Sequence, residues 1–510
     1  MTTREIPAGS AIFVVGAGIM GAGIAQVAAQ AGHPVRLFDA RAGAAAAARE
    51  KLGSTLDGLA AKGRLDRAEA SAIAARVTAA GSLADARDAA LVVEAIVEDA
   101  GAKRALFAEL EAVVAPEAVL ATNTSSISVT ALAAGLQRRG RFVGMHFFNP
   151  VPLMKLVEVV SGLETEPAVA GAIEALARAW GKTPVHARST PGFIVNRIAR
   201  PYYAEAFGLL QDRAATPEQI DACLRGAGFR MGPCELMDLI GHDTNLSVTK
   251  SVWQANFGDA RYAPSLVQQE MVDGGLLGRK SGRGFFAHPQ APAAAPTVAT
   301  ATPPAGAIVS LHGAGPVVER WAAAFDAVGL SFEREAQSRW TGLQTADGEL
   351  RLTDGRTATE VAFEERVRNL AVFDRTPAAG GGAPGAALAC AIAEGATAAW
   401  AAAAAEWIRV AGRTPVVVED APGLVVARTL AMLVNEAADA VQQGVCSEAA
   451  ADLAMTLGLN WPAGPFAWLA DEGAAATTAL LDRLDRHHRG ERYRVSPWLR
   501  RRAWTGASVA

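Results

Sequence analysis

Residues 11–39 read AIFVVGAGIMGAGIAQVAAQAGHPVRLFD and contain, in order, a strand pattern, a glycine-rich turn and a helix pattern. The opening run AIFVVG is short, apolar and β-branched and ends at glycine, as a buried parallel strand does. The turn GAGIMG has the spacing Gly16-x-Gly18-x-x-Gly21 and leads into a helical pattern, and a second apolar run ends at Asp39. This order predicts an α/β fold with a parallel sheet.

In this context the three glycines predict a dinucleotide-binding turn of the Rossmann type, which an isolated GxGxxG would not. Gly16 permits the tight turn, Gly18 lets the backbone approach a pyrophosphate, and Gly21 lets the helix pack closely on the strand. Ile19 and Met20 complete the predicted cofactor-binding turn, where the helix N-terminus faces the phosphates.

The acid at the end of the second strand predicts which dinucleotide binds. Asp39 is expected to accept hydrogen bonds from the adenosine ribose hydroxyls and to repel a 2′-phosphate. We therefore expect NAD in preference to NADP, although Arg41 lies close by in the sequence.

Two further apolar runs, ALVVEAI (90–96) and VLATNTS (119–125), are predicted strands that end at polar residues. Ligands of open α/β sheets bind beyond the carboxyl ends of the strands. We therefore expect Glu98, Asn123 and Ser125 to face the cofactor. A turn or capping role is the alternative for Asn123 and Ser125.

Length and composition limit the class of protein. A chain of 510 residues is too long for one core, so about three to four domains are expected. The net charge of −4 does not favour nucleic-acid binding, and no apolar run approaches the roughly 20 residues of a membrane span. The first residues, MTTREIPAGS, have no apolar stretch before a cleavage site, so we expect no secretory signal. The cysteines are far apart in the sequence, which favours reduced thiols in a cytoplasmic protein over a zinc site or disulfides: Cys223, Cys234, Cys390 and Cys446.

Residues 144–158, GMHFFNPVPLMKLVE, place His146 in an apolar run that ends at Glu158. A histidine in such a run is most often a core residue bonded to a backbone carbonyl. Taken alone, the stretch leaves both this interpretation and a catalytic one open.

Several motifs together resemble the 3-hydroxyacyl-CoA dehydrogenase family. They occur in family order over roughly residues 8–288: GAGIMG (16–21), VVEAIVED (92–99), ATNTSSISV (121–129), MHFFNPVPLMKLVEVV (145–160) and TPGFIVNRIARPYYAEA (190–206). The longer architecture is similar to bacterial members that act in phenylacetate and short-chain hydroxyacyl-CoA catabolism, a β-oxidation type of fatty acid metabolism.

The resemblance implies an NAD-dependent oxidation of a (3S)-3-hydroxyacyl-CoA thioester to the 3-oxoacyl-CoA. His146 would be the base that takes the hydroxyl proton, and Glu158 would orient the ring. Ser125 and Asn196 match the family residues that hydrogen-bond the substrate oxygen. An imidazole, whose ordinary pKa is near neutrality, suits this proton transfer.

The same resemblance extends the predicted cofactor site. Glu98, Lys103 and Asn149 match family residues near the nicotinamide, and Lys280 would lie near the cofactor cleft. By composition alone Lys103 would pass for a solvated helix lysine. No metal is expected, because the eight histidines have no ligand spacing.

The rest of the chain predicts an all-α part and a repeat. The residues from 421 echo those from 190, with Pro191-Gly192 matching Pro422-Gly423, but Asn196 is matched by Ala427. We expect the copy to be structural and to pack on the first as a dimer mate would, so that a homodimer or an intrachain pseudo-dimer forms through the helical domains. The predicted domains are a Rossmann NAD-binding domain (1–189), a helical domain (190–288), a linker (289–306), a degenerate α/β module (307–418) and a second helical domain (419–510).

Two features of the second half have simple interpretations. His312 lies beside a glycine turn without the full fingerprint spacing and is expected to be structural. The basic tail (486–503) is expected to be a solvated face, with contact to the phosphates of coenzyme A as the alternative.

The acyl group and the reaction class retain alternatives. 3-Hydroxybutyryl-CoA and 3-hydroxyadipyl-CoA are the leading substrates, and the distal carboxylate of the latter would need a basic partner such as Arg200 or Arg230. The other possibilities are an NAD-dependent dehydrogenase of a free hydroxy or sugar acid, and a non-catalytic NAD-binding structural protein.

Overall fold

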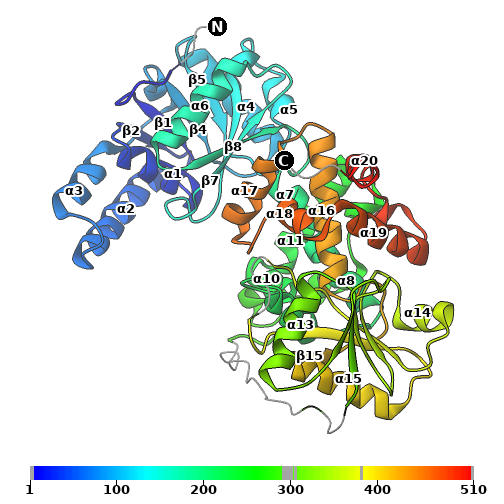
Figure 1. Ribbon diagram of the computed structural model, residues 1–510. Coiled ribbons are helices and arrows are strands. Elements are labelled where there is room, and N and C mark those ends of the chain that lie inside the picture. The colour runs from blue at the N-terminus through cyan, green and yellow to red at the C-terminus, as the bar shows by residue number, and fades with distance from the viewer. Residues whose placement is uncertain (1–4, 290–302, 304–306, 379–382, 507–510) are drawn as a thin grey trace. The chain divides into compact units, whose positions relative to one another are not determined.

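The computed structural model describes residues 5–289, 303, 307–378 and 383–506. The predicted linker therefore lies almost entirely outside the described residues. Contacts divide the chain into two compact units. The first contains the residues up to Arg197 together with Gly444–Leu459, and the second contains Ile198–Gln443 and the residues from Asn460 onward (Figure 1).

The first unit is built on an eight-stranded sheet with the order β3-β2-β1-β4-β5-β6-β7-β8. All neighbouring strands are parallel except β6 and β7, which are antiparallel. Strand order reverses between β1 and β4, which is where doubly wound sheets bind nucleotides. The strands are β1 (Ile12–Val15), β2 (Val35–Phe38), β3 (Val77–Ala79), β4 (Leu91–Glu94), β5 (Val119–Thr122), β6 (Phe142–Phe147), β7 (Leu156–Ser161) and β8 (Thr183–Arg188).

Helices cover this sheet and make its central strands fully buried. Every residue of β1, β4, β5 and β6 is buried, as expected for apolar strands that helices cover on both faces. The helices of this unit are α1 (Ile19–Gln30), α2 (Ala44–Ala61), α3 (Arg67–Arg76), α4 (Ala100–Val113), α5 (Val129–Ala133), α6 (Pro167–Ala179) and, from the second helical copy, α17 (Glu448–Leu459). The short helix α7 (Val195–Ile198) contains the chain boundary between the two units, after Arg197.

The second unit contains the predicted helical repeat. The segments that lead into the two copies have similar backbone, since Phe193 and Leu424 have nearly equal positive φ angles of 47° and 48° at matching positions. Helices α8 and α16 pack side by side (Figure 1). The first copy is α8 (Arg200–Gln211), α9 (Pro217–Gly226), α10 (Pro233–Ile240), α11 (His242–Ala255) and α12 (Leu266–Asp273), and the rest of the second is α16 (Val426–Gln442), α18 (Pro465–Glu472), α19 (Ala474–His488) and α20 (Pro497–Thr505).

The two helical copies bury charged groups of each other. Glu205 of the first copy accepts hydrogen bonds from Arg428 Nε at 2.8 Å and from Arg492 at 2.9 Å. Glu436, its counterpart in the second copy, accepts one from Tyr262 of the first copy at 2.6 Å and pairs with Arg261 at 3.2 Å. Both glutamates are completely buried, so the copies interlock through reciprocal ion pairs.

These pairs also show where several arginines of the basic tail lie. Arg492 pairs with Glu205 at 2.9 Å. Arg494 pairs with Asp439 at 3.3 Å, and Arg500 pairs with Asp482 at 2.6 Å. The chain's own carboxylates therefore partner these three guanidinium groups.

A second sheet of seven strands, with the order β10-β9-β11-β12-β13-β14-β15, confirms the predicted α/β module. Each of its strands takes the position of one strand of the first sheet, from β10 in the position of β2 to β15 in the position of β8. The difference in direction is at β11, which takes the position of β4 but runs antiparallel to both of its neighbours. Within the described residues it has no counterpart of β3. The elements are β9 (Val309–His312), α13 (Pro316–Ala327), β10 (Glu333–Glu335), β11 (Gly342–Thr345), β12 (Glu349–Leu352), α14 (Ala358–Glu365), β13 (Leu370–Phe373), β14 (Ala387–Ile392), α15 (Ala398–Val410) and β15 (Thr414–Val417).

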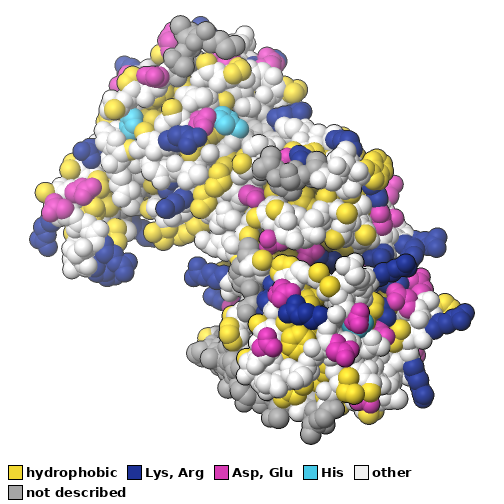
Figure 2. Space-filling model, in the orientation of Figure 1, with side chains coloured by type: hydrophobic (Ala, Val, Ile, Leu, Met, Phe, Trp, Pro, Cys, Tyr) yellow, Lys and Arg dark blue, Asp and Glu magenta, His cyan; other side chains and the backbone are white. Residues whose placement is uncertain are grey.

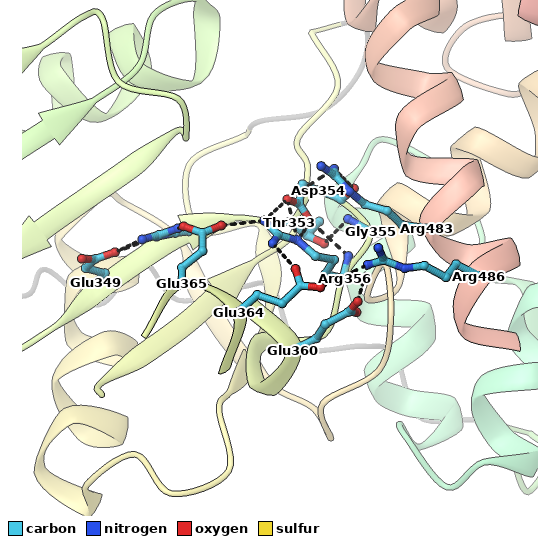
Figure 3. A network of polar contacts seen from close by, with 11 residues as sticks. Glu349, Thr353, Asp354, Gly355, Arg356, Glu360, Glu364, Glu365, Arg483 and Arg486 are labelled. Carbon is cyan, nitrogen blue, oxygen red and sulfur yellow. Dashed lines mark hydrogen bonds and ion pairs between the residues drawn. The ribbon is translucent and has the colours of Figure 1, made fainter. Parts of the chain in front are cut away.

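A polar network joins this module to α19 of the second helical copy (Figure 3). Arg483 of α19 donates to the Asp354 backbone oxygen at 2.8 Å, and Arg486 pairs with Glu360 of α14. Gly355, in the loop from β12 to α14, lies close to α19, because a Cβ at this position would be 2.9 Å from the Leu480 backbone oxygen. The module and the second helical copy are therefore closely packed.

His312 of this module has the structural contacts expected of it. Its ring stacks on Trp340 at a centroid distance of 4.1 Å, and its nitrogens lie 3.0 Å and 3.2 Å from the hydroxyls of Ser310 and Ser338.

On the face shown in Figure 2, basic and acidic side chains are interspersed over both units. All four cysteines are free, and three of them are buried. No helix within the described part of the chain is both long and apolar enough to cross a membrane.

Candidate active site

The antiparallel pairing of β6 and β7 brings His146 directly opposite Glu158. His146 Nδ1 lies 2.6 Å from Glu158 Oε2, and the two residues are only 6% and 0% exposed. A carboxylate can only accept, so Nδ1 donates its hydrogen to it. In the neutral imidazole this leaves Nε2 as the proton acceptor, which is the state a general base needs.

The second oxygen of Glu158 binds the backbone that carries Asn196. Glu158 Oε1 accepts hydrogen bonds from the amides of Ile194 at 2.9 Å and Val195 at 3.0 Å. Asn196 follows immediately and its side-chain nitrogen donates to the Ser125 backbone oxygen at 3.3 Å. One carboxylate thus links the histidine to the segment that presents Asn196, and Asn196 is linked to Ser125.

Two phenylalanine rings lie close to the imidazole of His146. The centroids of Phe148 and Phe193 lie 4.5 Å and 6.0 Å from that of His146. The base is therefore flanked by apolar aromatic groups.

A buried ionic pair lies at the carboxyl end of β4, next to the predicted cofactor site. Lys103 of α4 is 1% exposed and its Nζ lies 2.5 Å from Glu94, the last residue of β4. Glu94 also accepts from Thr122 Oγ1 at 2.6 Å and from the Ile96 amide at 2.7 Å. The position of Glu94 at a strand end was the available sequence signal, yet only Glu98 and Lys103 of this cluster were predicted.

Glu98 continues the cluster toward Ser125. It lies 3.2 Å from Lys103 Nζ and accepts from Thr124 Oγ1 at 2.6 Å and from the Ser125 amide at 2.9 Å. Burial alone would raise the pKa of Glu98, but the Lys103 ammonium and these hydrogen bonds outweigh it and the pKa is lowered. An ionised Glu98 therefore holds the loop that contains Ser125.

The glycine turn has the space that a dinucleotide requires. Gly16 has φ 102° and a Cβ there would lie 2.4 Å from the Ala95 oxygen, while a Cβ on Gly21 would lie 1.7 Å from the Gly16 oxygen. A Cβ on Gly18, in contrast, would meet nothing within 4 Å. The turn is therefore tight inside and open at Gly18, the position where a pyrophosphate would approach.

Asp39 lies at the carboxyl end of β2 and faces this turn. Its Oδ2 accepts from the Ala17 amide at 2.8 Å, and its Oδ1 accepts from Arg41 Nε at 3.0 Å. The hydrogen bond from Arg41 lowers the pKa of Asp39 to about 2, so the carboxylate is ionised. Ile19 is exposed and Met20 is half-buried at the start of α1.

The other predicted cofactor residues have separate positions. Asn123 Oδ1 accepts from the Phe147 amide at 2.8 Å, so this side chain joins the ends of β5 and β6. Asn149 is exposed on the loop that follows β6. Lys280 belongs to the second unit, where it pairs with Asp243.

Lys182 was not predicted and supports the loop after Asn149. Its Nζ donates to the backbone oxygens of Val151 at 2.5 Å and Met154 at 2.8 Å. Desolvation by burial lowers the pKa of Lys182 to about 8.

Family models match nearly the whole chain. The NAD-binding domain of 3-hydroxyacyl-CoA dehydrogenase matches residues 11–190, and its C-terminal domain matches residues 192–288 and again 423–508. The chain belongs to the 3-hydroxyacyl-CoA dehydrogenase family. A third model, the reduced Rossmann-fold domain of 3-hydroxybutyryl-CoA dehydrogenase, matches residues 350–422, within the second sheet module.

Relatives of this family match over the full length and over the first half. The 3-hydroxyadipyl-CoA dehydrogenase of Escherichia coli K12 is 42% identical over 96% of this chain and 97% of its own. A crystal structure of 3-hydroxybutyryl-CoA dehydrogenase from Escherichia coli K12 superposes with a TM-score of 0.87 at 39% identity, covering 97% of this chain and 98% of its own. The (S)-3-hydroxybutyryl-CoA dehydrogenase of Ralstonia eutropha is 40% identical with a TM-score of 0.54 and covers 55% of this chain and 99% of its own.

Family membership also supports the cofactor. The matched domain is an NAD-binding domain, and the open turn at Gly18 and the ionised Asp39 fit that dinucleotide. NAD is the cofactor of this 3-hydroxyacyl-CoA dehydrogenase fold, as the fingerprint predicted.

Proposed function

We propose that this protein oxidises the coenzyme A thioester of a short-chain (3S)-3-hydroxy acid to the 3-oxoacyl thioester, with NAD as acceptor. The observation that carries the proposal is the buried pair of His146 and Glu158. The same carboxylate binds the backbone just before Asn196, so base and substrate amide are held in one geometry.

His146 Nε2 accepts the proton of the 3-hydroxyl group. NAD, when bound, supplies the acceptor for the hydride that leaves C3. Glu158 keeps the imidazole in the tautomer with Nδ1–H and stabilises the imidazolium that forms, because its charge is opposite and its Oε2 is already hydrogen-bonded to the ring.

Ser125 and Asn196 position the oxygen on C3. Their polar groups would donate to that oxygen as it becomes a carbonyl, which is positioning and electrostatic catalysis rather than covalent chemistry. The link from the Asn196 side chain to the Ser125 backbone supports a joint role.

The cofactor would be held by residues that follow the carboxyl ends of the strands on both sides of the point between β1 and β4 where strand order reverses. Gly16, Gly18 and Gly21 would receive the pyrophosphate, and Asp39 would bind the adenosine ribose. Glu98 and Lys103 would contact the nicotinamide half, and Asn123 would position the strand ends. Asn149 and Lys280 are proposed for the cofactor on family resemblance alone.

The substrate is proposed to be 3-hydroxyadipyl-CoA or 3-hydroxybutyryl-CoA. The 42%-identical relative that matches over the full length is a 3-hydroxyadipyl-CoA dehydrogenase, and a structure that matches equally fully is a 3-hydroxybutyryl-CoA dehydrogenase. The two differ in the distal carboxylate of the adipyl chain, so both thioesters are to be compared directly.

The test is NADH formation with the two thioesters and with free 3-hydroxybutyrate, for the wild type, His146→Ala and the control His186→Ala. His186 is an exposed histidine on β8 that also pairs with a glutamate, Glu174. We expect thioester turnover that is lost in His146→Ala and kept in His186→Ala. Turnover of the free acid alone would favour a free hydroxy acid dehydrogenase, and NAD binding without turnover would favour a structural protein.

A further inference from the structure

Lys182 lies at the edge of the first sheet that carries the dinucleotide-binding turn. Strands β7 and β8 run opposite to the six strands on the other side of β7, so β8 begins at the edge where β1 ends. Lys182 immediately precedes β8 and is only 8% exposed. Its buried ammonium is therefore at the edge where open α/β sheets bind their ligands.

The ammonium of Lys182 holds the loop from β6 to β7 (residues 148–155), which follows the strand of the proposed base. Its Nζ donates to the backbone oxygens of Val151 and Met154. The amides of Leu153 and Met154 both donate to the Pro150 oxygen at 3.0 Å. The β6–β7 loop is thus a closed turn that one charged side chain binds at two carbonyls. Hydrogen bonds with an ionised partner are the strong ones.

The β6–β7 loop packs directly on the helix that follows the glycine turn. A Cβ on Gly23 of α1 would lie 2.8 Å from Cβ of Val151 and 3.5 Å from Cδ of Pro152. Gly23 is only one helical turn beyond the first residue of α1. The same loop contains Asn149, one of the proposed cofactor residues. The loop that Lys182 holds is therefore part of the wall around the proposed NAD site.

The second sheet module repeats this arrangement with an arginine. Thr414 of β15 pairs with the first residue of β14, as Thr183 of β8 pairs with the first residue of β7. Arg413 therefore takes the position of Lys182, and both are followed by Thr-Pro-Val. Arg413 Nη1 donates to the Ala383 backbone oxygen, in the loop from β13 to β14, at 3.2 Å. All of the proposed cofactor residues lie outside this module, so the contact of Arg413 serves the fold alone.

We propose that Lys182 is a positioning residue for the cofactor: it holds the β6–β7 loop against α1 and so keeps Asn149 and the glycine turn in the geometry that receives NAD. This inference rests on the proposed function, which assigns Asn149 and the turn to NAD. Without the ammonium, the dinucleotide has to order the loop as it binds, and this cost weakens binding. The proton transfer is affected far less, because Glu158 orients His146 within the sheet.

The test is a fluorescence titration of the full-length protein with NADH. We expect Lys182→Met to raise the Kd for NADH at least about tenfold, since a hydrogen bond to a charged group is worth that much or more. Lys182→Arg should recover most of the affinity, because arginine makes the equivalent contact in the second module. Arg413→Met is the matched control: it loses that equivalent contact and should bind NADH as the wild type does.

Turnover of a thioester separates positioning from loss of structure. In Lys182→Met the KM for NAD should rise while kcat changes far less, whereas a loss of folded enzyme lowers kcat and leaves KM unchanged. Lys182→Gln, whose neutral amide is one bond shorter, is the second variant if the methionine variant does not fold.

Wild-type NADH affinity in the methionine or glutamine variant would overturn the proposal. An equal loss in Arg413→Met would also overturn it, because the effect would then be a general one. Absence of thioester turnover in the wild type would refute the proposed function instead, and the NADH titration would still decide the role of Lys182.

Discussion

Glu158 has two sets of partners, and replacing it by glutamine or by alanine separates them. Glutamine has the same shape, so its oxygen can still accept from the amides of Ile194 and Val195. Its NH₂ group, however, would face His146 Nδ1, which must then accept a hydrogen bond. The ring hydrogen moves to Nε2, and the atom that should take the substrate proton is occupied.

The magnitudes of the two effects differ. In serine proteases the equivalent exchange of an acid for its amide, which also produces the wrong histidine tautomer, lowers kcat by about 10⁴, and we expect a comparable loss for Glu158→Gln with a small change in stability. Glu158→Ala leaves His146 Nδ1 and the two amides without an acceptor in a fully buried site. Three unsatisfied donors at about 1–3 kcal/mol each predict a loss of about 3 kcal/mol or more in unfolding free energy.

The assays are NADH formation for kcat and urea unfolding for stability, on wild type and both variants. A Glu158→Gln variant with near wild-type kcat would refute the tautomer argument. An alanine variant as stable as the glutamine variant would show that the bonds to residues 194 and 195 do not hold the helical segment.

Three further changes test other parts of the first unit. Gly21→Ala would place a Cβ 1.7 Å from a backbone oxygen, so NADH affinity by fluorescence titration should fall at least about tenfold; the helical Gly53→Ala, which meets nothing within 4 Å, should bind normally. Lys103→Met leaves Glu94 as an unpaired buried charge and should reduce the unfolding free energy in urea by about 3–5 kcal/mol; a loss below 1 kcal/mol, on the order of a surface pair, would contradict this. Because burial lowers the pKa of Lys182 to about 8 from 10.5, the folded state binds fewer protons than the unfolded state in that interval. The unfolding free energy of the wild type should therefore rise from about pH 8 to about pH 10 relative to Lys182→Met, and parallel curves would contradict the burial argument.

The fold of the first unit followed from local patterns. A strand, the spacing of Gly16, Gly18 and Gly21, and an acid at the end of the next strand are enough to specify a Rossmann half. The family motifs then gave His146 and Glu158. The contact of Glu158 with the amides of residues 194 and 195 could not be predicted, because hydrogen bonds between distant segments leave no periodicity in the sequence.

The burial of charged groups was the second feature that could not be predicted from the sequence. By composition alone Lys103 would pass for a solvated helix lysine, and only the tertiary structure shows that it pairs with Glu94 at the buried carboxyl end of the central strand β4. In the second module the sequence predicted a degenerate α/β module, but the reversal of β11 was not predicted. A local signal for it existed, since Asp347-Gly348 between two strand patterns is typical of a hairpin turn.

The reciprocal burial of Glu205 and Glu436 has a consequence for how the protein behaves in dilute solution. An interface of this kind between two separate chains obeys mass action and dissociates as the protein is diluted. Here both sides belong to one polypeptide, so their association is intramolecular and independent of protein concentration. A substitution in one half is also not repeated in the other. The two halves can therefore differ in sequence. Ala427 takes the place of Asn196 in the second copy, while the ion pairs that join the halves are kept.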